Sequence, residues 1–554
     1  MSKIKLAPWQ LSLLSAVFIV AANNGGLFAS LSRELDVLSA DGFGFLLTIT
    51  VLMVFVLNTL FLIFGVGRLQ KAVLAVFFIA TSILGYFSNE MGVVFHEEMF
   101  LNIAETLRDN NSAEAIELTS LPLMARVFFF GILPSALLIF VDLVHRPFFR
   151  ELGTRVIVAA ASLALLSGVV LPNYKYVTYF SVEHRDLRFK VMPIFPIMSL
   201  VRLTQDKLHR EQPFKVIDAD ATRFAGSGKR TVGIMVVGET ARADHFSLNG
   251  YRKQTNPMLS SAGDIVFGHG ESCGTSTLFS VPCMFSIKGR DTYTASDAEG
   301  ESNVLDILTA AGVRTIWIDN NSSCKHACDR IENVNLRQDL DEASPYYSDM
   351  GYFDGVLTEN IDAYLDGEGQ DTLIVLHSLG SHGPAYSRRY PPQFGVFTPY
   401  CDKASPKECS DELVSNAYDN TIVYTDYVLS QLIDRLRARV QDFDSFLLYA
   451  SDHGESLGEN GVYLHGLPYA LAPKAQTDVP FILWLSNGFQ KNHAISQLAV
   501  EQLGLRQLSH DNISHTLMGF YDVEATSYVA EQDLFARPDR GHARTLYSVA
   551  VSAM

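Results

Sequence analysis

Two short apolar runs, beginning at residues 231 and 445, end in residues that can bind a metal ion. Glu239 follows the run at 231–237, and Asp452 and His453 follow the run at 445–450. Taken singly, an acid after a strand often caps a helix, and a lone histidine is usually structural. Together they offer the oxygen and nitrogen ligands that suit zinc in proteins. The pattern therefore predicts a zinc site built from strand ends.

Further histidines stand at comparable positions. A third apolar run, at 372–376, is followed by His377 and, five residues later, by His382 in the sequence SLGSHGP. His465 lies twelve residues after His453, in the sequence YLHGLP. Each imidazole alone is most simply a satisfied surface or core side chain. In company with two carboxylates, these histidines are candidates for the same metal or ligand site.

The segment at 272–283, with the sequence SCGTSTLFSVPC, is dense in hydroxyl groups and is bracketed by two cysteines. Metal-assisted phosphoryl transfer needs a nucleophile, and a hydroxyl at a helix N-terminus beside zinc ionises more readily than it does in water. A disulfide across the segment would hold it rigid. The simpler alternative is a helix cap rich in serine and threonine. With the metal ligands counted in, we expect this segment to supply the nucleophile.

The elements that must position these residues follow from the pattern beyond Lys229. Short, β-branched apolar runs alternate there with helical stretches, which is typical of an α/β domain with a largely parallel sheet. In such sheets, ligands bind beyond the carboxyl ends of the strands. The predicted strands lie at 231–237, 313–318, 372–376, 445–450 and 480–485.

All cysteines lie between residues 273 and 409 and fall into three pairs that are local in sequence. An even, paired set confined to one region predicts disulfides in an oxidising compartment. Buried free thiols and a cysteine-ligated metal are the alternatives, although no C-x2-C spacing occurs. The six residues are Cys273, Cys283, Cys324, Cys328, Cys401 and Cys409.

The first third of the chain contains five stretches that are long and apolar enough to cross a bilayer, which needs about 20 residues each. Five buried core helices in succession would be an unusual alternative. The hydrophobic content of 48% agrees with a membrane protein, and the net charge of -17 argues against nucleic-acid binding. The stretches run approximately over 11–29, 45–66, 72–94, 121–144 and 155–171.

The charges between these stretches orient them. Basic residues precede the first stretch and separate the second from the third and the fourth from the fifth, so these segments are expected in the cytoplasm. The loop at 96–120 is acidic and belongs on the other side. Five spans that begin inside end outside, in the compartment that the cysteines predict. A cleaved signal peptide is the alternative for the first stretch, but Gly25 and Gly26 lie within it and four spans follow.

We therefore expect a transmembrane domain of five helices at 1–171, a bridging segment at 172–230 and an outer catalytic domain at 231–554. The bridging segment mixes aromatic, basic and apolar residues. It is either a simple linker or, as we expect, an amphipathic stretch that lies on the membrane surface.

As a set, the motifs resemble those of the phosphoethanolamine transferases that modify lipid A, the family that includes the mobilised colistin-resistance enzymes. The motifs are GET after the first strand, SCGTST followed by SVPCMFS, HGP after the third strand, and SDHGES with a later LHG. The resemblance covers nearly the whole chain. It implies a multi-pass protein of the bacterial inner membrane, with a cytoplasmic N-terminus and a periplasmic domain of the alkaline-phosphatase and sulfatase type.

The resemblance also implies a site, residue by residue. Thr277 would be the catalytic nucleophile, while His382 and His465 would contact the phosphoethanolamine or a second, weaker zinc ion. The ligands of the tightly held Zn2+ would be Glu239, Thr277, Asp452 and His453. The disulfides would join Cys273 to Cys283, Cys324 to Cys328 and Cys401 to Cys409.

The implied reaction has two steps. Thr277 takes phosphoethanolamine from phosphatidylethanolamine and forms a covalent intermediate, which then passes the group to lipid A. The protein would contact membrane lipids, bind no nucleic acid and act as a monomer.

The loop after the third stretch carries residues that resemble a lipid head-group site in relatives, although the sequence LRDNNSA makes this loop longer. Asn89 and Glu90 are further candidates, because polar groups at membrane depth usually have a function. Their alternative role is that of an interfacial anchor. The loop candidates are Asn102, Thr106 and Glu114.

Several rival functions share parts of this pattern. A sulfatase needs a C-x-P-x-R-type sequence, which is missing here. A phosphoglycerol transferase would share five spans and a threonine nucleophile and is the closest enzymatic alternative. A membrane sensor would have no need of a complete set of Glu, Thr, Asp and His. Within the favoured family, a core sugar or a protein is an alternative acceptor to lipid A.

Overall fold

The computed structural model describes two compact units of the chain. Unit 1 comprises Met1–Phe100 and Thr119–His209 with the short piece Asn460–Val462, and unit 2 comprises Leu101–Leu118, Arg210–Glu459 and Tyr463–Met554. Within these units, the described residues are 4–34, 39–65, 67, 69–108, 118–144, 146–183, 185–208, 213–224, 229–338, 340–359, 361–366, 369–403, 405–504 and 506–536.

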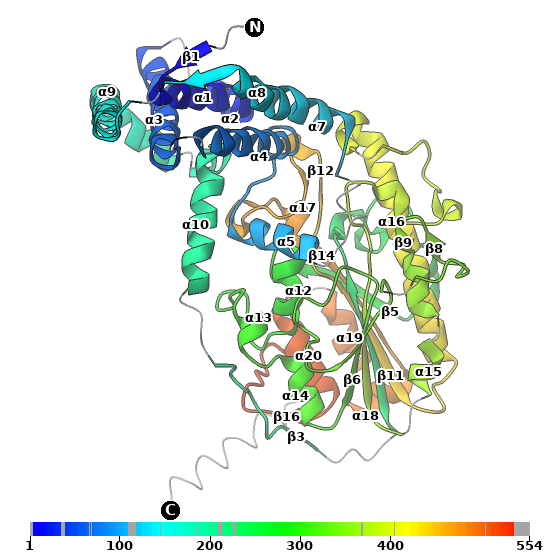
Figure 1. Ribbon diagram of the computed structural model, residues 1–554. Coiled ribbons are helices and arrows are strands. Elements are labelled where there is room, and N and C mark those ends of the chain that lie inside the picture. Colours follow the sequence, from blue (N-terminus) through cyan, green and yellow to red (C-terminus); the bar gives the residue numbers. More distant parts are fainter. Residues whose placement is uncertain are drawn as a thin grey trace, which may run out of the picture. The chain divides into compact units, whose positions relative to one another are not determined.

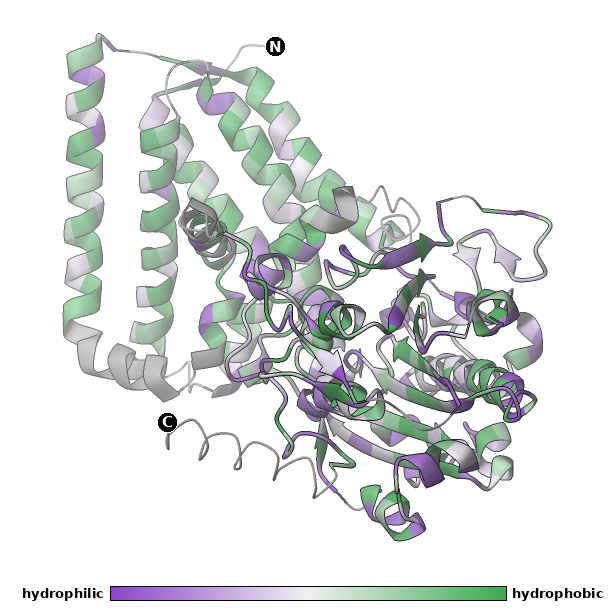
Figure 2. Ribbon diagram, turned by 90° about the horizontal axis from the view of Figure 1, so that it is seen from below, coloured by the Kyte–Doolittle hydropathy of each residue, from purple (hydrophilic) through white to green (hydrophobic). Residues whose placement is uncertain are grey.

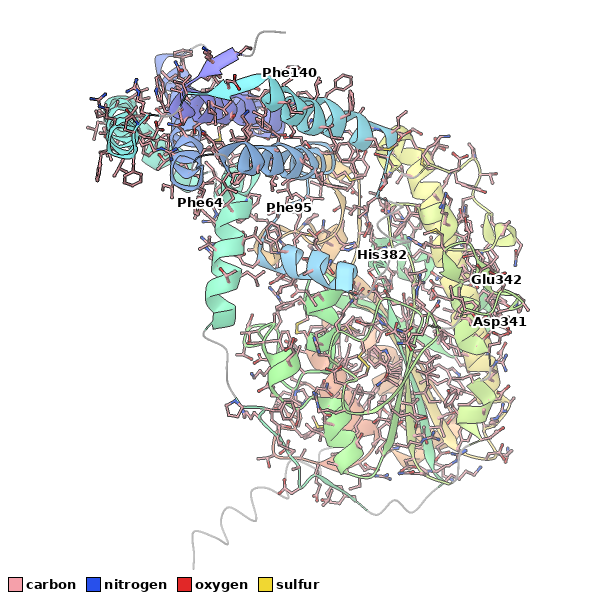
Figure 3. All side chains as sticks on the ribbon, in the orientation of Figure 1. Phe64, Phe95, Phe140, Asp341, Glu342 and His382 are labelled. Atoms are coloured by element: carbon pink, nitrogen blue, oxygen red, sulfur yellow. A yellow bond between two sulfur atoms is a disulfide. The ribbon has the colours of Figure 1, made fainter. Side chains whose placement is uncertain are left out.

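Unit 1 is built from apolar helices, which appear green in Figure 2. Among the described residues, four helices are long and apolar enough to cross a membrane, and a bent pair of shorter helices makes a fifth span if it is counted as one. Many apolar side chains face outward, including Phe64 and Phe140 (Figure 3). An apolar outer surface suits lipid as the surrounding solvent. The four spans are Gly42–Phe64, Leu69–Met91, Leu121–Phe140 and Phe148–Leu171. They lie in α3 Ala40–Phe64, in α4 Leu69–Met91, in the run from α7 Leu121–Arg126 through η1 Val127–Ile132 and α8 Leu133–Leu137 to η2 Leu138–Phe140, and in α9 Phe148–Glu183.

The first predicted span, at 11–29, is not one straight helix. The structure has α1 Pro8–Asn23 and α2 Gly25–Glu34, and the pair is bent by 60°. The buried side chain of Asn24 stabilises the break, because it donates to the carbonyls of Val20 and Met192 and accepts from the Met192 N–H. Such internal partners satisfy the backbone groups that a broken helix leaves open.

The fifth predicted span ends at residue 171, and the apolar span of α9 also ends there, at Leu171, but the helix itself is longer. Helix α9 continues to Glu183, past the predicted end at residue 171. The reason is that a fall in hydropathy marks the end of an apolar surface and not the end of a helix. Unit 1 further contains a small parallel pair of strands that the sequence did not predict, β1 Ile4–Leu6 and β2 Val141–Leu143. The remaining helices of this part of the chain are α5 Glu97–Arg108, η3 Arg185–Lys190 and α10 Ile194–Leu208.

Unit 2 is centred on a sheet that has eight strands in the described residues, in the order β15-β5-β14-β11-β4-β10-β6-β7. The strands from β11 to β7 in this order run parallel, and β14 is antiparallel to both of its neighbours. All five predicted strands are present. The strands are β4 Thr231–Gly238, β5 Ile265–Glu271, β6 Arg314–Asp319, β7 Glu332–Asn335, β10 Thr372–His377, β11 Asp444–Ser451, β14 Asp478–Leu485 and β15 Leu508–Ser509.

The unpredicted strands β5, β7 and β15 are short or carry polar and glycine residues, so they lack the apolar run of a central strand. Smaller two-stranded sheets accompany the main one. They pair β3 Thr222–Arg223 with β16 Val523–Glu524, β8 Tyr347–Ser348 with β9 Gly351–Tyr352, and β12 Ser456–Leu457 with β13 Tyr463–Leu464.

Helices cover both faces of the main sheet (Figure 1). Successive residues of β4 belong to different apolar clusters: Met235 and Val237 pack with α12, α14 and α20, whereas Ile234 and Val236 pack with α16. Burial on both faces explains why every residue of β4 is buried and why its sequence is continuously apolar. The helices are α11 Pro257–Ala262, α12 Thr277–Phe285, α13 Asp297–Gly300, α14 Val304–Ala310, α15 Ile361–Leu365, α16 Asp411–Arg437, α17 Lys474–Thr477, α18 Asn487–Asn492, α19 Gln497–Leu503 and α20 Asp511–Phe520.

The cysteines of unit 2 form three disulfides, in the pairs that the sequence predicts, and none of the six is a free thiol. Each disulfide closes a short loop. The pairs are Cys273 with Cys283, Cys324 with Cys328 and Cys401 with Cys409.

Candidate active site

Two neighbouring parallel strands bring three metal-binding side chains together. Glu239 follows β4, and Asp452 and His453 follow β11, which pairs with β4 along its whole length. Ligand atoms of the three side chains all lie within 4.8 Å of one another. His453 Nε2 is 3.4 Å from Glu239 Oε1 and 3.3 Å from Asp452 Oδ2. The pairing of the two strands therefore brings Glu239 and Asp452, which are more than 200 residues apart in the sequence, into one cluster.

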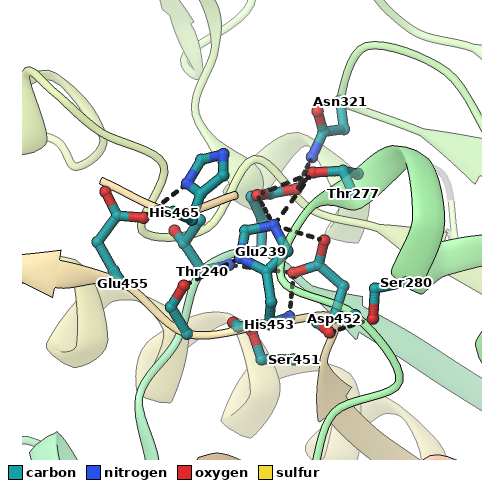
Figure 4. Close-up of polar contacts among 12 residues, drawn as sticks. Glu239, Thr240, Thr277, Ser280, Asn321, Ser451, Asp452, His453, Glu455 and His465 are labelled. Carbon is teal, nitrogen blue, oxygen red and sulfur yellow. Dashed lines mark hydrogen bonds and ion pairs between the residues drawn. The ribbon is translucent and has the colours of Figure 1, made fainter. Parts of the chain in front are cut away.

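Thr277 joins this cluster as the first residue of α12 (Figure 4). Its hydroxyl lies 3.1 Å from Glu239 Oε2 and 3.3 Å from His453 Nε2. Thr277 is 7% exposed, whereas Glu239, Asp452 and His453 are fully buried. The partial positive charge of a helix N-terminus favours an ionised oxygen at this position. The geometry thus gives Thr277 the surroundings of a nucleophile.

The electrostatics of the cluster fit a bound dication. Burial raises the pKa of Glu239, and the nearby charge of Asp452 raises it further, while burial also raises the pKa of Asp452. Burial lowers the pKa of His453, so its imidazole is neutral and can be a ligand. Asp452 Oδ2 is buried and accepts no hydrogen bond from the described residues. Two buried carboxylates without a cation are unfavourable, and a zinc ion held by these residues would neutralise them.

Asn321 is a site residue that the sequence did not predict. Its side-chain amide donates to Glu239 Oε2 at 2.9 Å and to the carbonyl of Ser378 at 2.9 Å. The backbone N–H of Asn321 in turn donates to Asp319 Oδ1. A signal was present, because Asn321 comes shortly after the predicted strand at 313–318, at the edge of the sheet where ligands bind. Asn321 therefore fixes the orientation of the Glu239 carboxylate.

The backbone around Glu239 is also tightly held. Thr240 has a positive φ of 53°, which is strained for a residue other than glycine, and its N–H donates to Asp452 Oδ1. Gly380 has a φ of +53°, and a Cβ at this position would lie 2.6 Å from the carbonyl oxygen of Glu239. The next residue, Ser381, donates its N–H to that same oxygen. Strain of this kind persists only where surrounding contacts determine the geometry.

We expect Asn321→Ala to weaken zinc binding by about 10–100-fold, the usual effect of losing an outer hydrogen-bond partner of a ligand. The glutamate would still be present but would no longer be held in one orientation. Titration of the purified protein with zinc in a competing chelator measures this effect. Asn333→Ala, a substitution of a surface asparagine on β7, serves as the control. Equal zinc affinities of the two variants would contradict the assigned role of Asn321.

His465 and His382 lie beside the cluster. The ring centroids of His453 and His465 are 4.4 Å apart, and those of His465 and His382 are 5.4 Å apart. His465 Nδ1 is 2.8 Å from Glu455 Oε2, and the other oxygen of this fully buried carboxylate accepts from the Tyr386 hydroxyl. Glu455 thus fixes the imidazole of His465, so that Nε2 is left for a ligand.

The two imidazoles differ in charge. Burial lowers the pKa of His382, and the neighbouring His465 lowers it further. For His465, burial also acts to lower the pKa, but the charge and hydrogen bond of Glu455 outweigh it and raise the pKa to about 9. A neutral and a charged imidazole side by side can hold one phosphate group and move one proton.

His377, the other candidate of the third run, has a different place. It ends β10, is fully buried, and its Nδ1 lies 3.1 Å from Asp319 Oδ2. The same carboxylate accepts from the Trp317 indole N–H. His377 therefore packs behind the cluster, where it supports the loop that carries Asn321.

The segment that carries Thr277 is fixed at both ends. The disulfide between Cys273 and Cys283 spans it, and His510 links it to β11, since its Nδ1 accepts from the Cys273 N–H and its Nε2 lies 2.9 Å from the Ser451 carbonyl. Neither the position nor the role of His510 was predicted. This histidine belongs to a turn far along the chain and offers no motif of its own.

We expect the double variant Cys273→Ser/Cys283→Ser to lose about 2–3 kcal/mol of stability, because the disulfide closes a short loop. Cys401→Ser/Cys409→Ser is a matched control, as its loop is of similar length. Both variants should unfold at lower temperature, but only the first should also lose turnover at temperatures where it is folded. Thermal unfolding and transfer rates of both proteins test this. Equal turnover in the two variants would show that the clamp does not position Thr277.

The predicted lipid residues have mixed outcomes. Asn102 is a half-buried residue of α5, whereas the side chain of Thr106 and all of Glu114 lie outside the described residues. A role for these three in lipid binding stays a prediction. Asn89 has partners within unit 1, because its side chain accepts from the Gly26 N–H and donates to the Asn23 carbonyl.

The fold and the buried cluster define a class of protein. A family model described as Sulfatase matches residues 232–523, which is more than half of the chain and places unit 2 in the sulfatase and alkaline-phosphatase superfamily. A second model, described as Phosphoethanolamine transferase EptA/EptB, matches residues 53–208.

Similar proteins agree over almost the full length. Phosphoethanolamine transferase EptA of Escherichia coli strain K12 is 34% identical over 544 residues, which cover 96% of each chain. Phosphatidylethanolamine transferase Mcr-1 of Escherichia coli is 35% identical over 549 residues, or 96% of this chain and 98% of the relative. The chain therefore belongs to the phosphoethanolamine transferase family, as its motifs indicate.

A solved structure supports the same assignment. The integral membrane protein lipooligosaccharide phosphoethanolamine transferase A (EptA) from Neisseria meningitidis matches with a TM-score of 0.91 at 31% identity. The match covers 96% of this chain and 99% of that one. The protein is thus a phosphoethanolamine transferase with a helical membrane unit and a sulfatase-like catalytic unit.

Proposed function

We propose that this enzyme moves phosphoethanolamine from phosphatidylethanolamine to lipid A through a covalent intermediate on Thr277. One observation carries the proposal: the Thr277 hydroxyl lies within hydrogen-bond distance of Glu239 and His453, in a buried cluster whose residues suit zinc. A bound zinc ion would supply positive charge that lowers the pKa of the hydroxyl and stabilises charge on the phosphoryl oxygens. Its ligands would be Glu239, Thr277, Asp452 and His453.

In the first step, Thr277 Oγ1 forms a bond to phosphorus, and the bond between phosphorus and the diacylglycerol oxygen breaks. The hydroxyl proton leaves toward the carboxylate oxygen that it already faces, Glu239 Oε2. The leaving oxygen needs a proton, and His465 can give one because the charge and hydrogen bond of Glu455 outweigh burial and raise the pKa of its imidazole. The products are diacylglycerol and a phosphoethanolamine ester of Thr277.

In the second step, a phosphate oxygen of the acceptor attacks the same phosphorus and its proton passes to His465. The bond between phosphorus and Thr277 Oγ1 breaks, and Thr277 takes back its proton from Glu239. The neutral His382 and the restored His465 flank the phosphorus-bearing group and can orient its oxygens. A second, weaker zinc ion is the alternative ligand of these two imidazoles in this proposal. Positioning and electrostatic stabilisation are the main sources of rate in phosphoryl transfer.

The choice of acceptor rests on relatives. The Neisseria meningitidis structure is that of a lipooligosaccharide phosphoethanolamine transferase, and an Escherichia coli relative over 52% of this chain is named Kdo(2)-lipid A phosphoethanolamine 7''-transferase. The first name gives lipooligosaccharide as the acceptor, and the second gives Kdo(2)-lipid A. Lipid A phosphate is the acceptor that we propose for this chain.

The proposal includes a membrane topology. Basic residues between the spans favour a cytoplasmic N-terminus, and five spans then bring the catalytic unit to the periplasm. Disulfides are typical of that oxidising compartment. The corresponding domains are a membrane domain at 1–171, a bridging segment at 172–230 and a catalytic domain at 231–554, all in a single chain of the inner membrane.

Mass spectrometry of lipid A tests this function. Cells that express the intact protein should contain lipid A with an added phosphoethanolamine, and cells with the Thr277→Ala variant should not. If lipid A stays unmodified while the purified protein still cleaves phosphatidylethanolamine, the proposed acceptor is wrong and core sugars or proteins must be analysed. If the purified protein leaves phosphatidylethanolamine intact, the proposed donor is wrong.

A further inference from the structure

Two opposite charges lie within the apolar helices of unit 1. Glu90 is in the last turn of α4, and Arg126 is the last residue of α7 before the helix widens into the π-helical stretch η1. Charged side chains within membrane helices are unfavourable, so they usually mark a functional site. Short π-helical stretches are likewise frequent at functional sites. This place in unit 1 therefore suggests a ligand.

The guanidinium of Arg126 is only partly used by the protein. Nη2 donates to the Ala22 carbonyl at 2.9 Å and contacts Asn23 Oδ1 at 3.4 Å, and the group lies over the Phe130 ring. Nε is buried, and no hydrogen-bond acceptor for it is present among the described residues. A buried N–H of this kind is unfavourable unless an acceptor is supplied. An anionic oxygen of a ligand would supply one.

The arginine lies at the break between α1 and α2. Asn89, next to Glu90, closes this break, because it donates to the Asn23 carbonyl and accepts from the Gly26 N–H. Broken membrane helices with polar partners commonly line binding sites, since backbone that leaves the helix must be satisfied inside the protein. The break thus forms a polar patch in an otherwise apolar unit.

The chemistry of the two charges selects a class of ligand. Glu90 is close enough to Arg126 to interact with it electrostatically, and both side chains are half-buried, so both reach the surface of the unit. One cation and one anion within electrostatic reach of each other are complementary to a zwitterion. Arginine matches the oxygens of a phosphate through parallel hydrogen bonds, and a carboxylate accepts hydrogen bonds from an ammonium group.

We propose that Arg126 and Glu90 form a head-group subsite that receives phosphatidylethanolamine in unit 1, with the phosphate on Arg126 and the ammonium on Glu90. The subsite holds the donor before its phosphate is transferred, and it rests on the proposed function for the identity of the lipid. The competing explanation is structural: Arg126 only satisfies a backbone carbonyl at the end of α1, through its hydrogen bond to Ala22.

A matched arginine separates these explanations. Arg155 in α9 also donates to the carbonyls at the end of a membrane helix, Leu62 and Gly65, and it pairs with Glu151 on its own helix. If Arg126 were purely structural, Arg126→Gln and Arg155→Gln would have similar effects. If Arg126 binds the donor, only Arg126→Gln affects the use of phosphatidylethanolamine.

The experiment uses the full-length protein in mixed micelles with two donors. One is phosphatidylethanolamine, and the other is a water-soluble phosphoethanolamine ester of a chromogenic alcohol, which needs only the catalytic cluster of unit 2. Arg126→Gln and Glu90→Gln should each raise the KM for phosphatidylethanolamine by about tenfold, the loss expected for one charge-assisted hydrogen bond. Cleavage of the soluble ester should remain within about twofold of the unsubstituted protein, a margin well below that tenfold loss.

Competition tests the ammonium side. Phosphatidylglycerol carries the phosphate but lacks the ammonium, so it should inhibit the unsubstituted protein less than phosphatidylcholine does. Glu90→Gln should remove this difference. Where Arg126→Gln fails to accumulate in membranes, Arg126→Lys decides the question, because it keeps the charge but loses the parallel hydrogen bonds and should raise the same KM.

The proposal is overturned if the KM for phosphatidylethanolamine is unchanged in both variants, or if Arg155→Gln raises it equally. It is also overturned if the variants lose cleavage of the soluble ester to the same extent as that of the lipid. If the unsubstituted protein cleaves neither donor, the proposed function itself fails, a result that differs from every outcome above.

Discussion

Thr277→Ala is expected to reduce phosphoethanolamine transfer by at least about a thousandfold, since loss of a catalytic nucleophile commonly has an effect of this size or larger. The substitution removes the only described hydroxyl that contacts both Glu239 and His453. It leaves two carboxylates and one imidazole of the cluster in place, so the fold and much of the zinc affinity should persist. Transfer rates with phosphatidylethanolamine and the zinc content of the same sample are the measurements.

The neighbouring hydroxyls provide the controls. Ser276 immediately precedes Thr277, and its buried Oγ makes no hydrogen bond to the described residues, so Ser276→Ala should keep most of the activity. Thr277→Ser keeps a hydroxyl at the start of α12 and should keep part of the activity. Intact-mass analysis of the unsubstituted protein after mixing with donor should show one added phosphoethanolamine, which Thr277→Ala lacks. Full activity of Thr277→Ala would disprove the covalent mechanism.

Glu239→Gln is the second substitution with a large expected effect, and it should act in opposite directions on activity and on the stability of the metal-free protein. Zinc content and transfer should both fall, because the variant loses one of the two buried carboxylate ligands. The decrease in zinc affinity should exceed that of Asn321→Ala, which removes only a hydrogen-bond partner. Near neutral pH the metal-free variant should nevertheless be more stable than the metal-free parent, since its folding no longer requires a carboxylate to be buried or protonated.

The direction of the stability change in the metal-free protein follows from the pKa shifts of the two buried carboxylates. In the metal-free folded protein, burial raises the pKa of Glu239 and that of Asp452 above the values of the unfolded chain. The folded state then holds more protons, so the stability that these two groups contribute is fully present below about pH 4 and is lost as the pH rises through neutrality. The loss is at most about 1.4 kcal/mol per pH unit for each proton. Glu239→Gln removes one such proton and should make the slope shallower.

Thermal unfolding of the full-length protein in detergent, with a chelator and then with zinc, measures these effects between pH 5 and pH 8. With zinc the trend should reverse, because metal binding requires deprotonated ligands. Glu342→Gln is the control, since this exposed glutamate lies on the surface of unit 2 (Figure 3) and should change neither slope. A metal-free parent whose stability does not fall with pH would contradict the assigned electrostatics of the cluster.

The sequence by itself determined much of this protein. Continuous apolar runs such as TVGIMVV predicted β4 and the other central strands, because strands buried on both faces need apolar residues at every position. The length and hydropathy of the apolar stretches predicted the membrane spans, because the thickness and apolar interior of the bilayer require both properties. Local spacing of the cysteines predicted the disulfides. The motifs also drew attention to Glu239, Thr277 and the residues after β11.

Only the tertiary structure decided how these parts meet. The sheet order places β4 between β11 and β10, and this order brings Asn321 and Thr277 to the same carboxylate. Such contacts join segments far apart in the chain, and no local pattern encodes them. The pairing of Glu455 with His465 and the break at Asn24 are of the same kind. Local periodicity reports which surface of an element is buried, whereas the partners of a buried polar group depend on how distant elements pack.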